Sequence, residues 1–396
     1  MANDYTFHQV ATILNGIVQM AQGRAENTGH VPVDTSEFVS VANTAITTVG
    51  LDPIMGAISQ MINRTVFAHR PYDRKFQVLE NSDIAFGNAV RKITPLFTDS
   101  AEAQPMYNDQ PADGQSTDQY TIKRPKAIQT IITGAEQYEV KAPTVFVDQL
   151  KTAFTGPDEL MRFMTAQTGE VQNDIEQQME QLDRNTVANF AGNIVLRANE
   201  SHVHLLTEYN ALTGLSLTAT TVYQPATFEA FVKWMYVRMN QISDRLENRS
   251  VNYHATIGDA VILRHTPKRL QKLLLYSPIM RQIETMALSG IYHNDLLSIA
   301  KHESVDYWQD FEQPDRIDVT PSTLNSSGSV ITGNAVNQAA VVGILFDTDA
   351  MGTNVFMHSV DVTPLNAKGR YYNTYHHFAK RYWNDPTENG VLFTLD

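Results

Sequence analysis

The sequence contains no cysteine. This absence excludes disulfide bonds, thiol nucleophiles, iron–sulfur clusters and zinc sites with cysteine ligands. Charged residues are also scarce, at 18% of the 396 positions, against about 25% in typical soluble domains. Because the centres of protein interfaces are depleted in charge, we expect much of the surface to be covered by partners.

The chain has no excess of positive charge, since 43 acidic residues outnumber 30 lysines and arginines and leave a net charge of −13. This balance argues against a protein that mainly neutralises phosphates. The longest apolar run that we find, 339–346, is far below the ~20 residues of a membrane span. The first lysine or arginine is Arg24, so we expect no secretory signal and no membrane partner.

Familiar enzyme motifs are missing as well: there is no Walker A spacing, no dinucleotide fingerprint and no Gly-x-Ser-x-Gly elbow. One candidate for chemistry is the pair Asp347 and Asp349, which follows an apolar strand as in Mg²⁺-dependent aspartyl-phosphate hydrolases. Those sites also need a downstream lysine and further acids, and only 47 residues follow Asp349. We therefore favour a charged strand end followed by a turn.

A second candidate is a pair of histidines, His202 and His204, which could bind a metal from one face of a strand. No carboxylate recurs at ligand spacing beside them, and Glu208 is the only near candidate. We therefore expect ordinary surface or interface histidines, with no metal and no cofactor.

The first part of the chain predicts an arm and an extended loop. Residues 1–70 hold short amphipathic helices, each too short to be stable alone, so we expect an arm that lies against something larger. Within the loop region 71–147, β-prone runs flank Gly134-Ala135 and predict a hairpin that turns there. A lone two-stranded ribbon is marginal in water, so it needs support, such as another copy of the chain.

A basic cluster lies near the base of this ribbon. We interpret Lys123, Arg124 and Lys126 as partners of acids on a neighbouring copy rather than of DNA, because the chain as a whole is acidic. The predicted contact residues between copies are Lys123, Arg124, Lys126, Ile131, Gly134 and Tyr138.

The rest of the chain predicts a mixed α+β fold. The strongest helical segment is 156–198, because Pro157 suits a first helical position and acids follow it in the first turn. A second helix is predicted over 225–247, a strand over 252–258, and a third helix that starts at the N-cap Thr266 and is interrupted by Pro278. Closing β segments are predicted at 341–346, 354–362, 371–383 and 391–395.

This order of elements resembles the major capsid proteins of tailed bacteriophages, which have the Hong Kong 97-type fold. Local strings are similar to those of small podophage-like capsid proteins. They are Tyr120 to Pro125, Ala142 to Phe154, Gly343 to Gly352, Thr363 to Asn373 and Asn384 to Gly390. The resemblance covers most of the chain from about residue 112 onward.

The resemblance implies a non-enzymatic shell protein whose hexamers and pentamers form an icosahedral head around double-stranded DNA, without sequence-specific binding. It also implies scaffold, portal and decoration proteins as partners, assembly in the host bacterial cytoplasm and a place in the virion. The implied domains are an arm (1–70), an extended loop region (71–147), a peripheral domain with a spine helix (148–205 and 336–372) and an axial domain (206–335 and 373–396). The alternatives are a phosphohydrolase using Asp347 and Asp349, a cellular encapsulating compartment, and a portal or tail component.

Overall fold

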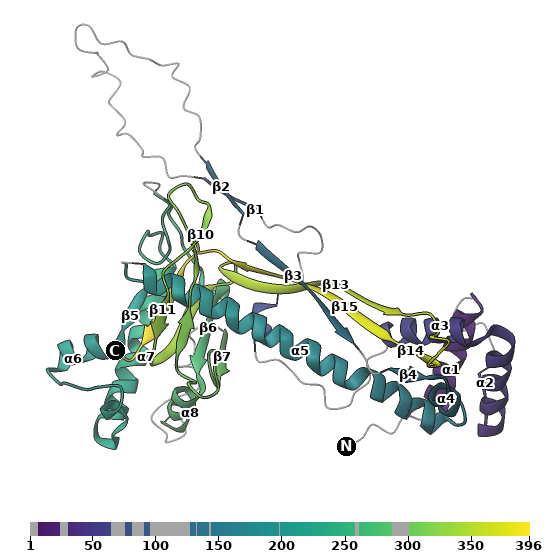
Figure 1. Ribbon diagram of the computed structural model, residues 1–396. Helices are drawn as coiled ribbons and strands as arrows, with labels where there is room; N and C mark the ends of the chain where they lie inside the picture. The colour runs from purple at the N-terminus through teal and green to yellow at the C-terminus, as the bar shows by residue number, and fades with distance from the viewer. Residues whose placement is uncertain are drawn as a thin grey trace, which may run out of the picture.

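A long helix, α5 (Pro157–Leu196), connects the two ends of the molecule (Figure 1). Its forty residues confirm the helix predicted over 156–198. Gly156 is the N-cap, Pro157 opens the first turn, and Asp158 and Glu159 follow at the positive end of the helix dipole. The computed structural model describes residues 7–23, 31–64, 76–80, 91–95, 127–131, 133–141, 144–197, 199–257, 261–286 and 301–396.

The arm is a cluster of three short helices packed on the start of α5, and they confirm the predicted short helical pieces. Its helices are α1 (Phe7–Ala21), α2 (Thr35–Val49) and α3 (Leu51–Arg64), and they share one core with α4 (Val147–Ala153). Asp34 caps α2 by accepting a hydrogen bond from the Glu37 N–H at 2.8 Å. The Tyr372 hydroxyl donates to Asp52 at 2.6 Å. The arm therefore gains its support from its own chain.

A five-stranded sheet forms the centre of the other end. Its strand order is β5 (His202–His204), β16 (Gly390–Thr394), β12 (Val341–Asp347), β6 (Gln271–Tyr276) and β7 (Lys301–Val305). Side chains alternate between its two faces. Leu345 and Phe393 pack against α6 (Leu205–Thr213) and α7 (Pro225–Leu246), whereas Ile344 and Leu392 pack against the last turns of α5. Both faces are thus covered by helices.

A three-stranded sheet runs beside α5 and links the two ends (Figure 1). Its strand order is β13 (Met351–Val362), β15 (Thr374–Asn384) and β3 (Thr133–Lys141). Val140 and Phe378 from this sheet share a small core with Val171 of α5. The β segments predicted at 341–346, 354–362, 371–383 and 391–395 are therefore present, with shifted ends.

Short elements complete the described part of the chain. They are η1 (Gln77–Leu79), β1 (Arg91–Pro95), β2 (Ala127–Ile131), β4 (Val145–Phe146), η2 (Thr221–Tyr223), η3 (Lys268–Leu270), α8 (Ser277–Met286), β8 (Ile317–Val319), β9 (Ser322–Leu324), β10 (Val330–Thr332), β11 (Val336–Gln338) and β14 (Tyr371–Tyr372). The paired strands among them are β1 with β2, β4 with β14, β8 with β11 and β9 with β10.

The hairpin predicted at Gly134-Ala135 is wrong. Both residues lie inside β3, where Gly134 pairs with Tyr382 and Ala135 with Arg381. The nine-residue pairing of β3 with β15 replaces the expected local ribbon. The strand before it, β2, pairs instead with the upstream strand β1, which the sequence analysis did not predict.

Two further predictions are wrong. The helix expected from Thr266 is one 3₁₀ turn followed by strand β6, because Leu273, Leu274 and Leu275 form an apolar run that is buried on both faces of a sheet. The strand expected over 252–258 is absent from its described part, 252–257, which holds a turn, a bend and a single bridge residue at Ile257.

The bend at 254 holds a buried histidine. His254 Nε2 lies 2.8 Å from the Ile262 carbonyl oxygen, and Nδ1 lies 3.3 Å from Asn389 Oδ1. Burial lowers the pKa of His254 to about 4, although its hydrogen bonds to Ile262 and Asn389 oppose this shift. The ring is therefore neutral and fixed beneath the loop before β16.

We expect acid to weaken the fold through His254. Above pH 6.5 the ring is neutral in both states, but between pH 6.5 and about 4 only the unfolded chain gains the proton. The free energy of unfolding should fall by up to about 3 kcal/mol over this window. Urea titrations of the unassembled chain at several pH values measure it. His254→Gln should reduce the slope, and an unchanged slope would contradict the assignment.

Candidate assembly surfaces

The β1–β2 pair is a two-stranded sheet of its own within the described residues (Figure 1). Its antiparallel register places Arg91 opposite Ile131 and Pro95 opposite Ala127. Thr94 is 2% exposed, and its hydroxyl accepts a hydrogen bond from the Arg264 guanidinium at 3.0 Å. This contact anchors β1 to the segment that leads into β6.

The predicted contact residues fall into three groups. Lys123, Arg124 and Lys126 lie outside the described residues. Ile131 is the last residue of β2, whereas Gly134 and Tyr138 belong to β3. Ile131 therefore belongs to the β1–β2 sheet, whereas Gly134 and Tyr138 lie in the long sheet beside α5.

Tyr138 already has contacts within its own chain. Its ring stacks on Phe378 with centroids 5.4 Å apart, and Lys380 Nζ lies 4.6 Å from its centroid. These contacts fix the ring against β15.

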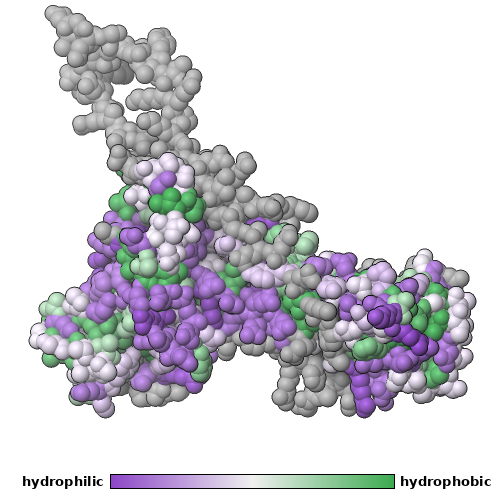
Figure 2. Space-filling view, in the orientation of Figure 1, coloured by the Kyte–Doolittle hydropathy of each residue, from purple (hydrophilic) through white to green (hydrophobic). Residues whose placement is uncertain are grey.

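Exposed apolar side chains gather on β10, a place that the sequence analysis did not single out. Val330 and Ile331, adjacent on β10, are 53% and 45% exposed, and Figure 2 shows a hydrophobic patch near the β9–β10 hairpin. Leu212 of α6 and Val237 of α7 are also well exposed. A contiguous apolar patch, such as the one on β10, is the feature that marks an interaction surface.

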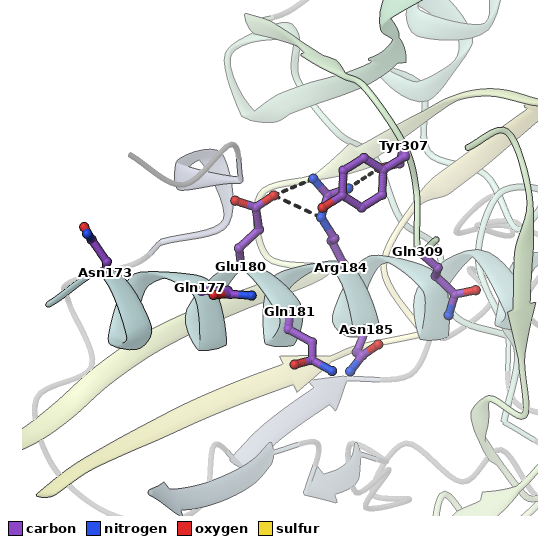
Figure 3. A pocket seen from close by; sticks show the side chains of 8 residues that line it. All are labelled: Asn173, Gln177, Glu180, Gln181, Arg184, Asn185, Tyr307 and Gln309. Atoms are coloured by element: carbon purple, nitrogen blue, oxygen red, sulfur yellow. Dashed lines mark hydrogen bonds and ion pairs between the residues drawn. The ribbon is translucent and has the colours of Figure 1, made fainter. Parts of the chain in front are cut away.

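A polar cleft lies along α5 (Figure 3). Its volume is about 540 Å³. Amide side chains dominate its lining, and the cleft also contains an ion pair and a tyrosine. The lining residues are Asn173, Gln177, Glu180, Gln181, Arg184, Asn185, Tyr307 and Gln309.

The ion pair at this cleft fastens a distant segment to the helix. Arg184 Nε donates to Glu180 Oε1 at 3.0 Å, and Arg184 Nη1 donates to the Tyr307 carbonyl oxygen. The guanidinium also lies 3.6 Å from the centroid of the Tyr307 ring and 4.8 Å from that of Phe76. One buried cation thus ties the segments of Phe76 and Tyr307 to α5.

The aspartate pair that suggested a hydrolase has a structural role at the end of β12. Asp347 is 5% exposed. Its Oδ2 accepts from the Thr266 hydroxyl at 2.6 Å, and its Oδ1 accepts from the Asp349 N–H at 2.9 Å. Both carboxylate oxygens of Asp347 therefore hold the turn in place. This agrees with the interpretation of Asp347 and Asp349 as a charged strand end followed by a turn.

The two histidines lie on β5, the edge strand of the five-stranded sheet. Glu208, the carboxylate named for them in the sequence, binds Arg238 instead, with oxygens 2.6 and 2.9 Å from the guanidinium. The carboxylate that the structure brings to His204 is that of Asp396, at 2.8 Å.

Within the described ranges, no single helix has both the length and the apolar character needed to span a membrane. One pair, Thr35–Val49 with Leu51–Ile58, meets that test only when joined across a bend of 117°.

Together, a helical arm, a long helix beside a long sheet, and a five-stranded sheet at the far end define a phage capsid fold. The capsid structure of Staphylococcus phage Andhra has a TM-score of 0.52 at 13% identity, over 84% of this chain and 87% of that chain. A structure described as head fiber and inner core protein of bacteriophage P68 has a TM-score of 0.51 at 9% identity, over 84% and 87%. At these identities the likeness concerns the fold.

The family model for the Phi29-like phage major capsid protein matches residues 15–394, and the chain belongs to this family. A comparison with curated proteins finds no match. The protein is therefore a structural subunit of the virion capsid, which is a shell of many copies, and it is not an enzyme. Neither the phosphohydrolase nor the encapsulating compartment gains support from these comparisons.

Proposed function

We propose that the chain forms hexamers and pentamers that close into an icosahedral phage head around double-stranded DNA. The β1–β2 pair is the observation that carries this proposal: within the described residues it has no third strand, and an isolated two-stranded ribbon is marginal in water. Docking on a neighbouring copy would supply the missing support. The exposed apolar side chains of β10 offer further area for such contacts.

In this proposal residues 1–70 are the arm and 71–147 the extended loop region. Residues 148–205 and 336–372 form the peripheral domain, and 206–335 with 373–396 form the axial domain. Strand β12 pairs with β6 and β16, and β13 pairs with β15. The two domains would therefore share both large sheets, which favours a rigid subunit.

Charge supports the proposed arrangement of partners. Lys123, Arg124 and Lys126 would pair with acids of a neighbouring copy, close to contacts made by Ile131, Gly134 and Tyr138. The net charge of −13 has the sign of the DNA phosphates, which suits a container that encloses DNA without binding particular sequences. Scaffold, portal and decoration proteins would complete the head in the host bacterial cytoplasm.

Charge reversal at the basic cluster tests the proposal. The full chain should form closed shells, alone or with the other head proteins of its phage, and electron microscopy detects them. Combining Lys123→Glu, Arg124→Glu and Lys126→Glu should abolish closed shells, because each lost attraction becomes a repulsion at every copy of the interface.

A matched control changes the net charge equally at exposed sites elsewhere. It combines Arg249→Glu, Arg269→Glu and Lys368→Glu, and it should leave shells intact. Normal shells from the cluster variant would exclude the proposed role of the three basic residues. A wild-type chain that stays monomeric both alone and with the other head proteins of its phage would overturn the proposed assembly itself.

A further inference from the structure

Parallel pairing at the edge of the five-stranded sheet gathers three metal-ligating side chains. His202 and His204 lie two residues apart on β5, so they project from the same face of the strand. In the register of β5 with β16, His204 pairs with Thr394. The chain that follows β16 then brings Asp396 beside the two imidazoles.

The distances between the ligand atoms fit a single ion. One ring nitrogen of each histidine and one carboxylate oxygen of Asp396 all lie within 4.8 Å of one another. The two imidazole centroids are 4.0 Å apart. Ligand atoms of a tetrahedral zinc site are separated by about 3.4 Å, as follows from bond lengths of ~2.0–2.1 Å. Zinc binding therefore requires the side chains to draw these three atoms together from separations of up to 4.8 Å.

Neighbouring side chains hold the ligands in place. Gln338 Nε2 donates to Asp396 Oδ2 at 3.1 Å, and the Thr394 hydroxyl donates to Asp396 Oδ1. His202 Nε2 lies 3.0 Å from Thr394 Oγ1. Hydrogen bonds of this kind orient the ligands at established metal sites.

The cluster is also open to solvent. The side chains of His204 and Asp396 are 46% and 43% exposed, so an ion can reach them and water can occupy a remaining coordination position. Two nitrogens and one carboxylate oxygen form a donor set that suits Zn²⁺ better than Mg²⁺ or Ca²⁺, which prefer oxygen ligands alone.

We propose that His202, His204 and Asp396 form a Zn²⁺ site that fastens the segment after β16 to the edge strand β5. The ion takes the place of the direct contact between His204 Nδ1 and Asp396 Oδ1, which lie 2.8 Å apart. The site adds to the capsid role and does not depend on how the copies assemble.

The test uses the full, unassembled chain without a polyhistidine tag and Zn²⁺ alone as the probe. Equilibrium dialysis followed by metal analysis should find one Zn²⁺ per chain. His204→Gln and Asp396→Asn should each weaken Zn²⁺ binding about 100-fold, and Gln338→Ala, which removes an orienting hydrogen bond, about tenfold. Both ligand positions are partly exposed, so these variants should fold, and circular dichroism checks this.

His265→Gln is the matched control, since it removes an exposed histidine outside the cluster. It should bind Zn²⁺ as the wild type does. Zinc should also raise the Tm of the wild type and of His265→Gln but not that of His204→Gln. No bound zinc in the wild type, or equal binding by wild type and His204→Gln, would overturn the site.

Discussion

Replacing Arg184 with methionine should lower the free energy of unfolding by about 3–5 kcal/mol. The side chains of Arg184 and Glu180 are only 6% and 5% exposed. Removing the cation leaves the Glu180 carboxylate buried without its partner, which is the costly way to break an ion pair. The change also removes the guanidinium from the face of Tyr307. Urea titration of the unassembled chain measures the loss.

The same helix provides a matched control for Arg184. Arg162 and Glu159 form an ion pair with a nitrogen–oxygen distance of 3.3 Å, but their side chains are 77% and 47% exposed. Arg162→Met should cost less than about 0.5 kcal/mol, because solvent screens an exposed pair. The double variant Glu180→Met, Arg184→Met should recover most of the stability, since it removes both charges of the pair together. Equal losses for Arg184→Met and Arg162→Met would show that the buried pair has no special role.

Phe190→Ala should cost about 3–5 kcal/mol, as expected for emptying the space of a fully buried aromatic ring. Phe190 is on α5 and belongs to the core that α5 shares with β12 and β16. Its ring lies against Gly390, where an added Cβ would overlap with two ring atoms. This close approach couples the long helix to the five-stranded sheet. Thermal or urea unfolding of the Phe190→Ala variant measures the lost stability.

The glycine side of this contact can be tested by a double-mutant cycle. Gly390→Ala should cost about 1–3 kcal/mol in the wild type through overpacking. It should cost less in the Phe190→Ala background, because the ring is gone. Gly169→Ala is the control: a Cβ there meets nothing within 4 Å, so it should stabilise α5 by about 0.5–1 kcal/mol. Additive effects of Phe190→Ala and Gly390→Ala would contradict the coupling.

Helices whose signals lie within their own segment were predicted from the sequence. Pro157 and the acids after it predicted the start of α5, and the apolar face from Phe228 to Leu246 predicted α7. The apolar run Leu273–Leu275 led to the wrong prediction of a helix in place of β6. A run that is buried on both faces of a sheet lacks the alternating pattern of a strand and fits a helix equally well.

Pairing between distant segments could not be predicted from the sequence in this way. Gly134 and Ala135 have the composition of a turn, yet β15 holds them in a straight strand. His204 gained its carboxylate from Asp396, which is 192 residues away. Local spacing pointed to Glu208 instead, and that side chain is used by Arg238. Nothing in the sequence near Gly134 or His204 indicates that β15 and Asp396 are their partners.

The position of β16 inside its sheet has a consequence for biosynthesis. Residues 390–394 are translated after every other strand of this sheet, yet they lie between β5 and β12. Until they leave the ribosome, two neighbouring strands keep open edges, so a nascent subunit stays unfinished and prone to edge pairing. A translation product that stops before Gly390 cannot complete this sheet. Only copies translated through Thr394 can therefore complete this sheet.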